Sequence, residues 1–383
     1  MTEERLHREF VALDVKSGGA MESQSGLQMM RPRVYGVLVS PQRPVDVACI
    51  VMHPVSNFMG HYLLEPLAER GIACLGLNSR YLNNDAMMQV ERAAQDLGAG
   101  VRWLRERGYK SVVLLGNSGG AALAALYQAE AERFTVTTFA DGSPSGLAAE
   151  DFTPSDGIVL FGAHEGRSLL FEKWIDPALI EEDDPEGIDA SIDMFNAKNG
   201  PPYAPDFIAE YRWRQIGRRD RIEHRVVARL KKFSSRPEGP QDEAFVIHRT
   251  LADPRCLDLS IDANDRVSGT IWGDAKRVNL SPNCVARLTS LRAFLSQWSS
   301  RSRMNGPACL SRTSVPVLHF TYTADASTFP STHAAWMNSA PGRIENVDVL
   351  GGNHYLAGQA GLVREVADGI CGWLSRHRLG AAA

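Results

Sequence analysis

Residues 111–127 read Ser-Val-Val-Leu-Leu-Gly-Asn-Ser-Gly-Gly-Ala-Ala-Leu-Ala-Ala-Leu-Tyr. The β-branched and leucine residues at the start of this stretch predict a strand, and the alanine- and leucine-rich run after them predicts a helix. Between the two, Gly116-x-Ser118-x-Gly120 implies a turn so sharp that side chains two residues either side of the serine would collide. The glycines therefore predict a strained strand-turn-helix that holds the Ser118 hydroxyl clear of the backbone.

A serine exposed at the start of a helix is suited to acyl chemistry. A base can reach one side of its hydroxyl and a substrate carbonyl the other, while free N–H groups at the helix N-terminus stabilise a developing negative charge. A glycine-rich packing turn is the structural alternative. Because the motif requires a strand before it and a helix after it, and both are predicted here, we interpret Ser118 as a nucleophile.

A serine nucleophile needs a base within hydrogen-bond reach and an acid that orients this base. His354 follows a glycine pair directly after the last predicted strand, which makes it the candidate base. Asp325 lies in the loop after the predicted strand at 315–321 and is the preferred acid. Asp348, inside a predicted strand, and Asp141 remain alternative acids.

Two N–H donors aimed at one point would stabilise the oxyanion of an acyl transfer. Gly119 follows the candidate nucleophile at the helix start and would supply the first donor. The second donor is expected after the strand that ends at His53; since Pro54 has no N–H, Val55 is the candidate and Ser56 the reserve. The His53 side chain itself either lines the mouth of the pocket or makes local structural hydrogen bonds.

Apolar strand-like runs alternate with amphipathic helical patterns from residue 34 onward. The predicted strands cover 34–39, 45–52, 73–77, 112–115, 158–161, 315–321 and 344–350, and the clearest helices cover 90–107, 121–131 and 361–376. A run at 134–140 competes with 157–161 for one strand, and we prefer the second because it is more uniformly apolar and follows a turn cluster. Short apolar strands separated by helices predict an α/β fold, with a mostly parallel sheet that helices cover on both faces.

The candidate residues and their order along the chain resemble the α/β-hydrolase superfamily. The motif around Ser118 is similar to its nucleophile elbow, His53-Pro54 stands where its members commonly have His-Gly, and Asp325 and His354 follow its seventh and eighth strands. Proline in place of glycine is a departure that affects the oxyanion loop. The resemblance implies the α/β-hydrolase fold and hydrolysis of esters, lactones, amides, thioesters or certain C–C bonds.

The resemblance covers 34–162 and 313–376. We predict a catalytic core of residues 1–162 and 313–383, with a cap of residues 163–312 inserted between the sixth and seventh strands of the fold. The cap is predicted to contain a charged helix at about 205–232 and a hairpin between Phe245 and Ile271. Its aromatic side chains either line a substrate pocket or pack the cap onto the sheet: Phe171, Trp174, Phe195, Tyr203, Tyr211, Trp213 and Trp272.

Composition narrows the class of protein further. A net charge of −4 over 383 residues does not indicate nucleic-acid binding, and we interpret the basic cluster at 212–232 as a solvated helix face because acidic residues interleave with it. The six cysteines include no C-x-x-C pair and are predicted to be reduced. Residues 1–5 lack an apolar signal region and no apolar stretch is long enough to span a bilayer, so we expect a cytoplasmic protein.

These features together predict a serine hydrolase that cleaves a carboxylic ester or lactone through an acyl-enzyme intermediate. The alternatives are a C–C bond hydrolase of ring-cleavage products, an amide or thioester hydrolase, and a non-catalytic ligand receptor on the same fold. The sequence has no zinc-ligand spacing, Walker A loop or dinucleotide motif, so we expect no metal and no organic cofactor. The expected partner is a small apolar or aromatic substrate rather than nucleic acid or a membrane, and the oligomeric state stays open, a homodimer included.

Overall fold

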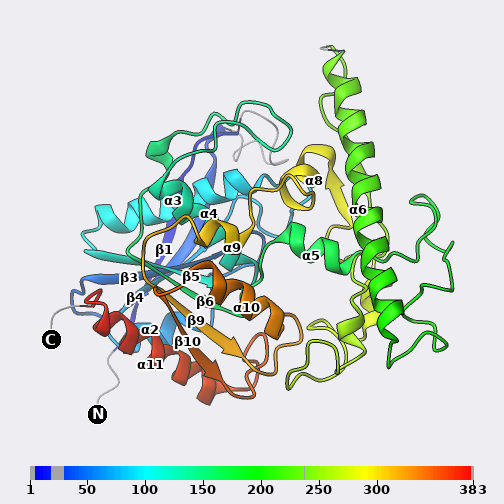
Figure 1. The fold of residues 1–383 in the computed structure, drawn as a ribbon. Helices are drawn as coiled ribbons and strands as arrows, with labels where there is room; N and C mark the ends of the chain where they lie inside the picture. The colour runs from blue at the N-terminus through cyan, green and yellow to red at the C-terminus, as the bar shows by residue number, and fades with distance from the viewer. Residues whose placement is uncertain (1–4, 19–29, 237, 381–383) are drawn as a thin grey trace.

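A computed structural model of the chain describes residues 5–18, 30–236 and 238–380. An eight-stranded sheet forms its centre, in the order β1-β2-β4-β3-β5-β6-β9-β10 (Figure 1). The strands are β1 (His7–Asp14), β2 (Arg33–Ser40), β3 (Val47–His53), β4 (Ala73–Asn78), β5 (Ser111–Asn117), β6 (Gly157–Phe161), β9 (Val317–Tyr322) and β10 (Ile344–Val349). β2 runs antiparallel to its neighbours β1 and β4, and the other neighbouring strands named here pair in parallel, which confirms the predicted mostly parallel sheet.

The central strands are apolar throughout because both of their faces are buried. Along β3, Ile50 points into one hydrophobic cluster and Val51 into the other, as the two-residue period of a strand requires. Ile50 lies opposite Leu114 of β5 in the parallel register, and Leu114 shares the cluster of Ile50. Of the two runs that could have formed the same strand, 134–140 and 157–161, the second forms β6, as predicted from its more uniformly apolar sequence.

Helices cover both faces of the sheet, as predicted. One cluster holds side chains of α3 (Val90–Glu106), α4 (Gly119–Glu132), α9 (Gly306–Leu310) and α10 (Pro330–Ser339). The other holds side chains of α2 (Leu64–Glu69) and α11 (Ala360–Arg376). None of the helices in the described part of the chain has both the length and the apolar character that a membrane span needs.

The segment between β6 and β9 contains further elements, and most of its apolar side chains form clusters of their own. In chain order they are α5 (Arg167–Trp174), α6 (Pro205–Ser234), β7 (Ala244–Val246), α7 (Ala275–Leu280), β8 (Leu288–Ser290), α8 (Leu291–Gln297) and α9. Figure 1 shows α6 as a long helix that stands beside the sheet and its covering helices. The last turn of the segment returns to the sheet, because Cys309 and Leu310 of α9 share the cluster of α4.

The predicted hairpin between Phe245 and Ile271 is wrong. β7 pairs antiparallel with β8, whose residues lie beyond the predicted range. Between β7 and α7 the chain folds largely as irregular turns, because buried side chains satisfy its backbone: Arg266 donates to the carbonyl oxygens of Arg255, Asp258 and Ile261. Such side-chain hydrogen bonds replace the ladder that a hairpin would have needed.

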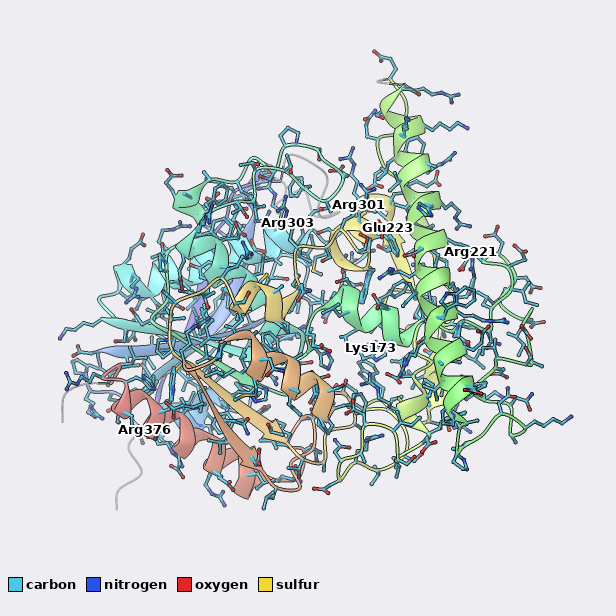
Figure 2. All side chains as sticks on the ribbon, in the orientation of Figure 1. Lys173, Arg221, Glu223, Arg301, Arg303 and Arg376 are labelled. Atoms are coloured by element: carbon cyan, nitrogen blue, oxygen red, sulfur yellow. The ribbon has the colours of Figure 1, made fainter. Side chains whose placement is uncertain are left out.

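The solvated-face interpretation of the basic cluster on α6 is wrong for the arginines on the side of the helix that packs against the protein. Helical spacing places Arg218 on the buried face of α6, where its side chain is 0% exposed and pairs with Glu182 at 2.7 Å. Arg212 reaches the fully buried Asp253 at 2.7 Å. Figure 2 shows Arg221 pointing away from α6, and the interpretation holds for this exposed residue.

All six cysteines are free thiols, as predicted. Cys49 and Cys74 are buried on adjacent parallel strands, where burial raises the pKa of both thiols and keeps them protonated. The predictions that concern residues 1–4 and the alanine tail at 381–383 lie outside the described residues.

Candidate active site

Ser118 lies in the turn between β5 and α4 with a left-handed φ of 53°. The two flanking glycines are required by space as well as by the turn. A Cβ on Gly116 would lie 2.7 Å from Cα of Ala121, and one on Gly120 would lie 2.4 Å from the backbone oxygen of Met52. Both contacts involve backbone atoms that cannot move aside, so the sequence motif and the strained turn have the same steric cause.

The structure brings Ser118, His354 and Asp325 into one hydrogen-bonded chain. Nε2 of His354 lies 3.1 Å from Oγ of Ser118, and Nδ1 of His354 lies 2.8 Å from Oδ2 of Asp325. His354 follows β10 and Asp325 follows β9, so the carboxyl ends of neighbouring parallel strands present both residues at the edge where β5 presents Ser118. Both partners are buried, at 2% and 0% exposure.

Asp325 is held as a carboxylate by its surroundings. Oδ1 accepts hydrogen bonds from the backbone N–H of Ser327 at 2.7 Å and of Thr328 at 3.1 Å, and Oδ2 accepts one from the Thr328 hydroxyl at 2.7 Å. Burial opposes ionisation, but the adjacent His354 and these hydrogen bonds outweigh it and hold the pKa of Asp325 below its usual value. Asp325 can therefore orient His354 and stabilise its imidazolium form at neutral pH.

The two alternative acids lie elsewhere. Asp348 is exposed on β10, where it accepts a hydrogen bond from Asn346 at 2.8 Å. Asp141 forms an ion pair with Arg292. Asp325 is the only one of the three carboxylates that contacts His354 among the described residues.

Replacing the acid tests this geometry. Asp325→Asn is expected to lower kcat/KM for ester hydrolysis by roughly 10²- to 10⁴-fold, because a neutral amide neither fixes the His354 tautomer nor stabilises its positive charge. The matched control Asp348→Asn removes an exposed carboxylate from the next strand and is expected to leave kcat/KM within a factor of about two. Steady-state kinetics of both variants on one ester decide the matter, and a larger loss from Asp348→Asn would contradict the assignment.

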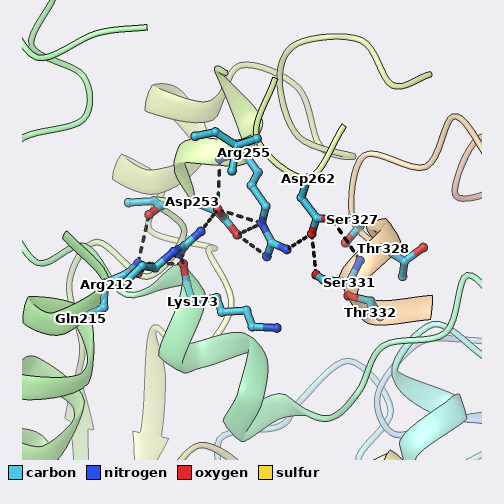
Figure 3. Close-up of polar contacts among 12 residues, drawn as sticks. Lys173, Arg212, Gln215, Asp253, Arg255, Asp262, Ser327, Thr328, Ser331 and Thr332 are labelled. Carbon is cyan, nitrogen blue, oxygen red and sulfur yellow. Dashed lines mark hydrogen bonds and ion pairs between the residues drawn. The ribbon is translucent and has the colours of Figure 1, made fainter. Parts of the chain in front are cut away.

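A loop of the segment between β6 and β9 supports the loop that carries Asp325. Nδ2 of Asn264 donates to the backbone oxygen of Asp325 at 2.8 Å, and the N–H of Asp265 donates to the backbone oxygen of Thr323 at 2.8 Å. Figure 3 shows the adjoining network, in which Asp262 bridges Arg255 and Ser331. The predicted cap thus contacts the acid loop directly.

The predicted oxyanion donors differ in their surroundings. Gly119 begins α4, so its N–H has no intrahelical acceptor and is available to a ligand. The N–H of Val55 instead donates to Nδ1 of His53 at 3.2 Å, and that of the reserve Ser56 donates to the same atom at 2.9 Å. The role of Gly119 stays a prediction, while both candidates for the second donor already have an intramolecular acceptor.

Sequence reasoning missed His164, which packs directly on the candidate base. Its ring stacks on that of His354 with centroids 5.2 Å apart, and its Nε2 lies 2.8 Å from the hydroxyl of Ser327. Burial, together with the neighbouring His354, lowers the pKa of His164 to about 3, so the ring is neutral. Its position shortly after β6, at the same sheet edge as the other site residues, was the available signal.

A cavity of about 410 Å³ opens over Ser118, within the range that binds small molecules. The sheet side contributes His53, Phe58 and Tyr62, and the segment between β6 and β9 contributes Arg167, Leu170, Trp174, Ile271, Trp272, Val285 and Trp298. Trp174 and Trp272 contact each other edge to face, at 6.2 Å between ring centroids.

The aromatic side chains of the predicted cap do not all have the same surroundings: some line the cavity, and others pack inside hydrophobic clusters. Trp174 and Trp272 line the cavity, while Phe171 packs inside a hydrophobic cluster of the segment. Phe195, Tyr203 and Tyr211 pack in another of its clusters. Trp213 is 69% exposed on α6, and Trp298, which sequence reasoning did not single out, also lines the cavity.

Comparison with known proteins identifies the fold. No protein-family model matches the sequence, and no curated protein matches it either. Among solved structures, the α/β hydrolase GrgF from Penicillium sp. sh18 is 13% identical with a TM-score of 0.52, covering 97% of this chain and 99% of its own. A hypothetical protein, PA2218, from Pseudomonas aeruginosa is 12% identical with a TM-score of 0.52, covering 98% of this chain and 95% of its own.

DcsB, solved in complex with its substrate analogue, is 12% identical with a TM-score of 0.51, covering 97% of this chain and 100% of its own. At these identities the likeness concerns the fold and carries no activity across. The sheet order, the serine turn after β5 and these three structures lead to one conclusion. The chain has the α/β-hydrolase fold, as its sequence predicts.

Proposed function

We propose that this protein is a serine hydrolase that cleaves a carboxylic ester or a lactone through an acyl-enzyme intermediate. The observation that carries the proposal is the unbroken hydrogen-bonded chain from Asp325 through His354 to Ser118, at a cavity large enough for a small substrate. A non-catalytic receptor on this fold would need neither the strained serine nor a buried carboxylate aligned behind the histidine.

The reaction follows from the positions of these groups. Oγ of Ser118 attacks the carbonyl carbon while its proton passes to Nε2 of His354, and the π electrons of the carbonyl move onto its oxygen. Collapse of this tetrahedral intermediate breaks the bond to the leaving oxygen, which takes the proton from His354. Water then attacks the acyl-enzyme by the same route and releases a carboxylic acid and the free Ser118 hydroxyl.

We propose that residues 163–312 act as a cap on the core of residues 1–162 and 313–383. The aromatic wall of the cavity supports the proposal that the cavity binds the acyl or the alcohol part of the substrate. Trp174 and Trp272 present large apolar faces there beside Ser118. Such a wall favours an apolar or aromatic substrate and excludes water from the reacting carbonyl. A cytoplasmic location stays a prediction from the sequence.

The proposal is tested by turnover. The purified protein should hydrolyse p-nitrophenyl esters of graded acyl length, and a fluorophosphonate should label one serine. A panel of aryl amides, thioesters, lactones and dienol ketones shows which type of bond the enzyme cleaves. The substrate class whose leaving group fits the site is expected to give the highest kcat/KM. Preference for the dienol ketone would replace the ester assignment by C–C bond hydrolysis, and absence of both turnover and labelling would reject a hydrolase altogether.

The cavity wall makes a separate prediction about specificity. Trp174→Ala and Trp272→Ala are each expected to change the ratio of kcat/KM for a long-chain over a short-chain ester by about 10-fold, because each removes apolar surface from the wall. The matched control is Trp213→Ala, which removes an indole that is 69% exposed on α6 and does not line this cavity. An unchanged ratio in both cavity variants would show that these side chains do not determine chain-length preference.

A further inference from the structure

His53, the last residue of β3, has a side chain whose two ring nitrogens lie in different surroundings. Nδ1 accepts hydrogen bonds from the backbone N–H groups of Val55 at 3.2 Å and Ser56 at 2.9 Å. A nitrogen that accepts two hydrogen bonds carries no hydrogen, so in the neutral ring the hydrogen is on Nε2. The loop after β3 therefore fixes one tautomer of His53, with Nε2 as a donor.

Nε2 of His53 lies close to the residue after the nucleophile. A Cβ built on Gly119 would lie 2.8 Å from this nitrogen. The Cβ position of a residue lies about 2.5 Å from its own amide nitrogen, so Nε2 of His53 and the amide nitrogen of Gly119 are at most about 5.3 Å apart. One oxygen can lie within hydrogen-bond distance of both donors at that separation.

The hydrogen on Nε2 is free for a ligand. Among the described residues no group accepts it, although the ring lines the cavity over Ser118. The glycine at 119 makes this placement possible, since a side chain there would occupy the space of the imidazole. Gly119 thus has a steric role that the nucleophile motif itself does not require, because the motif's glycines are Gly116 and Gly120.

We propose that the imidazole Nε2–H of His53, together with the backbone N–H of Gly119, forms the oxyanion hole of this site. The Val55 N–H, the donor expected from the sequence, then positions the ring instead of contacting substrate. When Oγ of Ser118 bonds to the carbonyl carbon and the carbonyl π electrons move onto oxygen, that oxygen accepts a hydrogen bond from each of the two donors. The inference rests on the proposed function, because the oxyanion exists only if Ser118 attacks a carbonyl.

The ring stays neutral under the conditions in which such a hydrolase works. Burial, and then the nearby Arg167 guanidinium, lower the pKa of His53 well below its ordinary value. A neutral donor with a fixed tautomer stabilises the oxyanion by a hydrogen bond and cannot lose its proton to it at neutral pH. Pro54 replaces the usual glycine in a loop that would then supply a side-chain donor, the Nε2–H of His53, in place of the expected backbone N–H of Val55.

Two substitutions separate the two ring nitrogens. The amide of asparagine reaches the position of Nδ1, so His53→Asn keeps an acceptor for Val55 and Ser56 and removes the donor near Gly119. The amide of glutamine reaches the position of Nε2, so His53→Gln keeps a donor near Gly119 and removes the acceptor. If the ring only holds the loop, His53→Asn should lower activity less than His53→Gln. If the ring stabilises the oxyanion, His53→Gln should lower activity less than His53→Asn.

The measurement compares kcat/KM on a p-nitrophenyl ester with that on the matching thionoester, whose sulfur accepts hydrogen bonds weakly. His53→Asn is expected to lower kcat on the ester by about 10²- to 10³-fold with little change in KM, and to lower the ester-to-thionoester ratio by at least about 10-fold. His53→Gln is expected to keep that ratio within about 3-fold of the unsubstituted protein. The ratio compares two substrates on one protein sample, so partial unfolding does not change it.

Two results would overturn the inference: a ratio for His53→Asn that stays within about 3-fold of the unsubstituted protein, or an equal fall in both variants. Failure of the proposed function looks different. In that case the unsubstituted protein hydrolyses neither substrate, or Ser118→Ala hydrolyses them equally well.

Discussion

Ser118→Ala is expected to lower kcat for ester hydrolysis by about 10⁴-fold or more while leaving the fold intact. The substitution deletes only the hydroxyl that lies 3.1 Å from Nε2 of His354. The strained backbone at φ 53° is held by the close packing around Gly116 and Gly120 and does not depend on the hydroxyl. Steady-state kinetics gives the loss, and the melting temperature shows whether the fold is kept.

Labelling supplies an independent measurement of the same prediction. A fluorophosphonate should transfer its phosphonyl group to the unsubstituted protein, with loss of fluoride, and should not react with Ser118→Ala. The matched control is Ser311→Ala, an exposed serine whose hydroxyl donates to the backbone oxygen of Ala308. Turnover near the original level in Ser118→Ala, or labelling that persists there, would place the nucleophile elsewhere.

The sequence was sufficient to predict which three residues meet at the candidate site, because their placement is local. Each of Ser118, Asp325 and His354 follows a short apolar strand directly, and parallel strands bring their carboxyl ends to one edge. Order along the chain and position after a strand therefore carried most of the information about the site. The glycine pattern had a local cause as well, since Gly116 and Gly120 each face backbone atoms within 3 Å.

Features that depend on contacts between distant segments were not predictable in this way. β7 pairs with β8 across about forty residues that include α7, and no turn signal links the two strands. Arg218 is buried only because Glu182 and backbone oxygens of a different segment meet its guanidinium. A charged residue in a charged run gives no sign of such a partner.

The first strand and the oxyanion loop show two further limits. β1 alternates, but only Val11 and Leu13 are buried, so its apolar pattern is too short to stand out at the sheet edge. The predicted donor at Val55 assumed that a backbone N–H faces the substrate, whereas here it faces the ring of His53. The tautomer of His53 depends on a hydrogen bond from a residue two positions away, and residue types alone do not predict such a bond.

His354→Ala is expected to lower kcat/KM about as much as Ser118→Ala, and the double variant is expected to be little worse than either single one. The reason is that the two groups act as a unit: without the base, the Ser118 hydroxyl keeps its proton, and without the hydroxyl, the base has no proton to take. The measurement is kcat/KM of the three variants on one ester, with His224→Ala on the exposed face of α6 as the matched control.

The melting temperature must be measured in the same experiment. Asp325 is fully buried, and replacing His354 removes the hydrogen-bond partner of its carboxylate. A melting temperature that falls in His354→Ala and recovers in Asp325→Asn combined with His354→Ala would identify this uncompensated carboxylate as the cause. The kinetic prediction is separate from that effect. Losses that multiply in the double variant would mean that Ser118 and His354 contribute independently, and the proposed transfer of a proton between them would then be wrong.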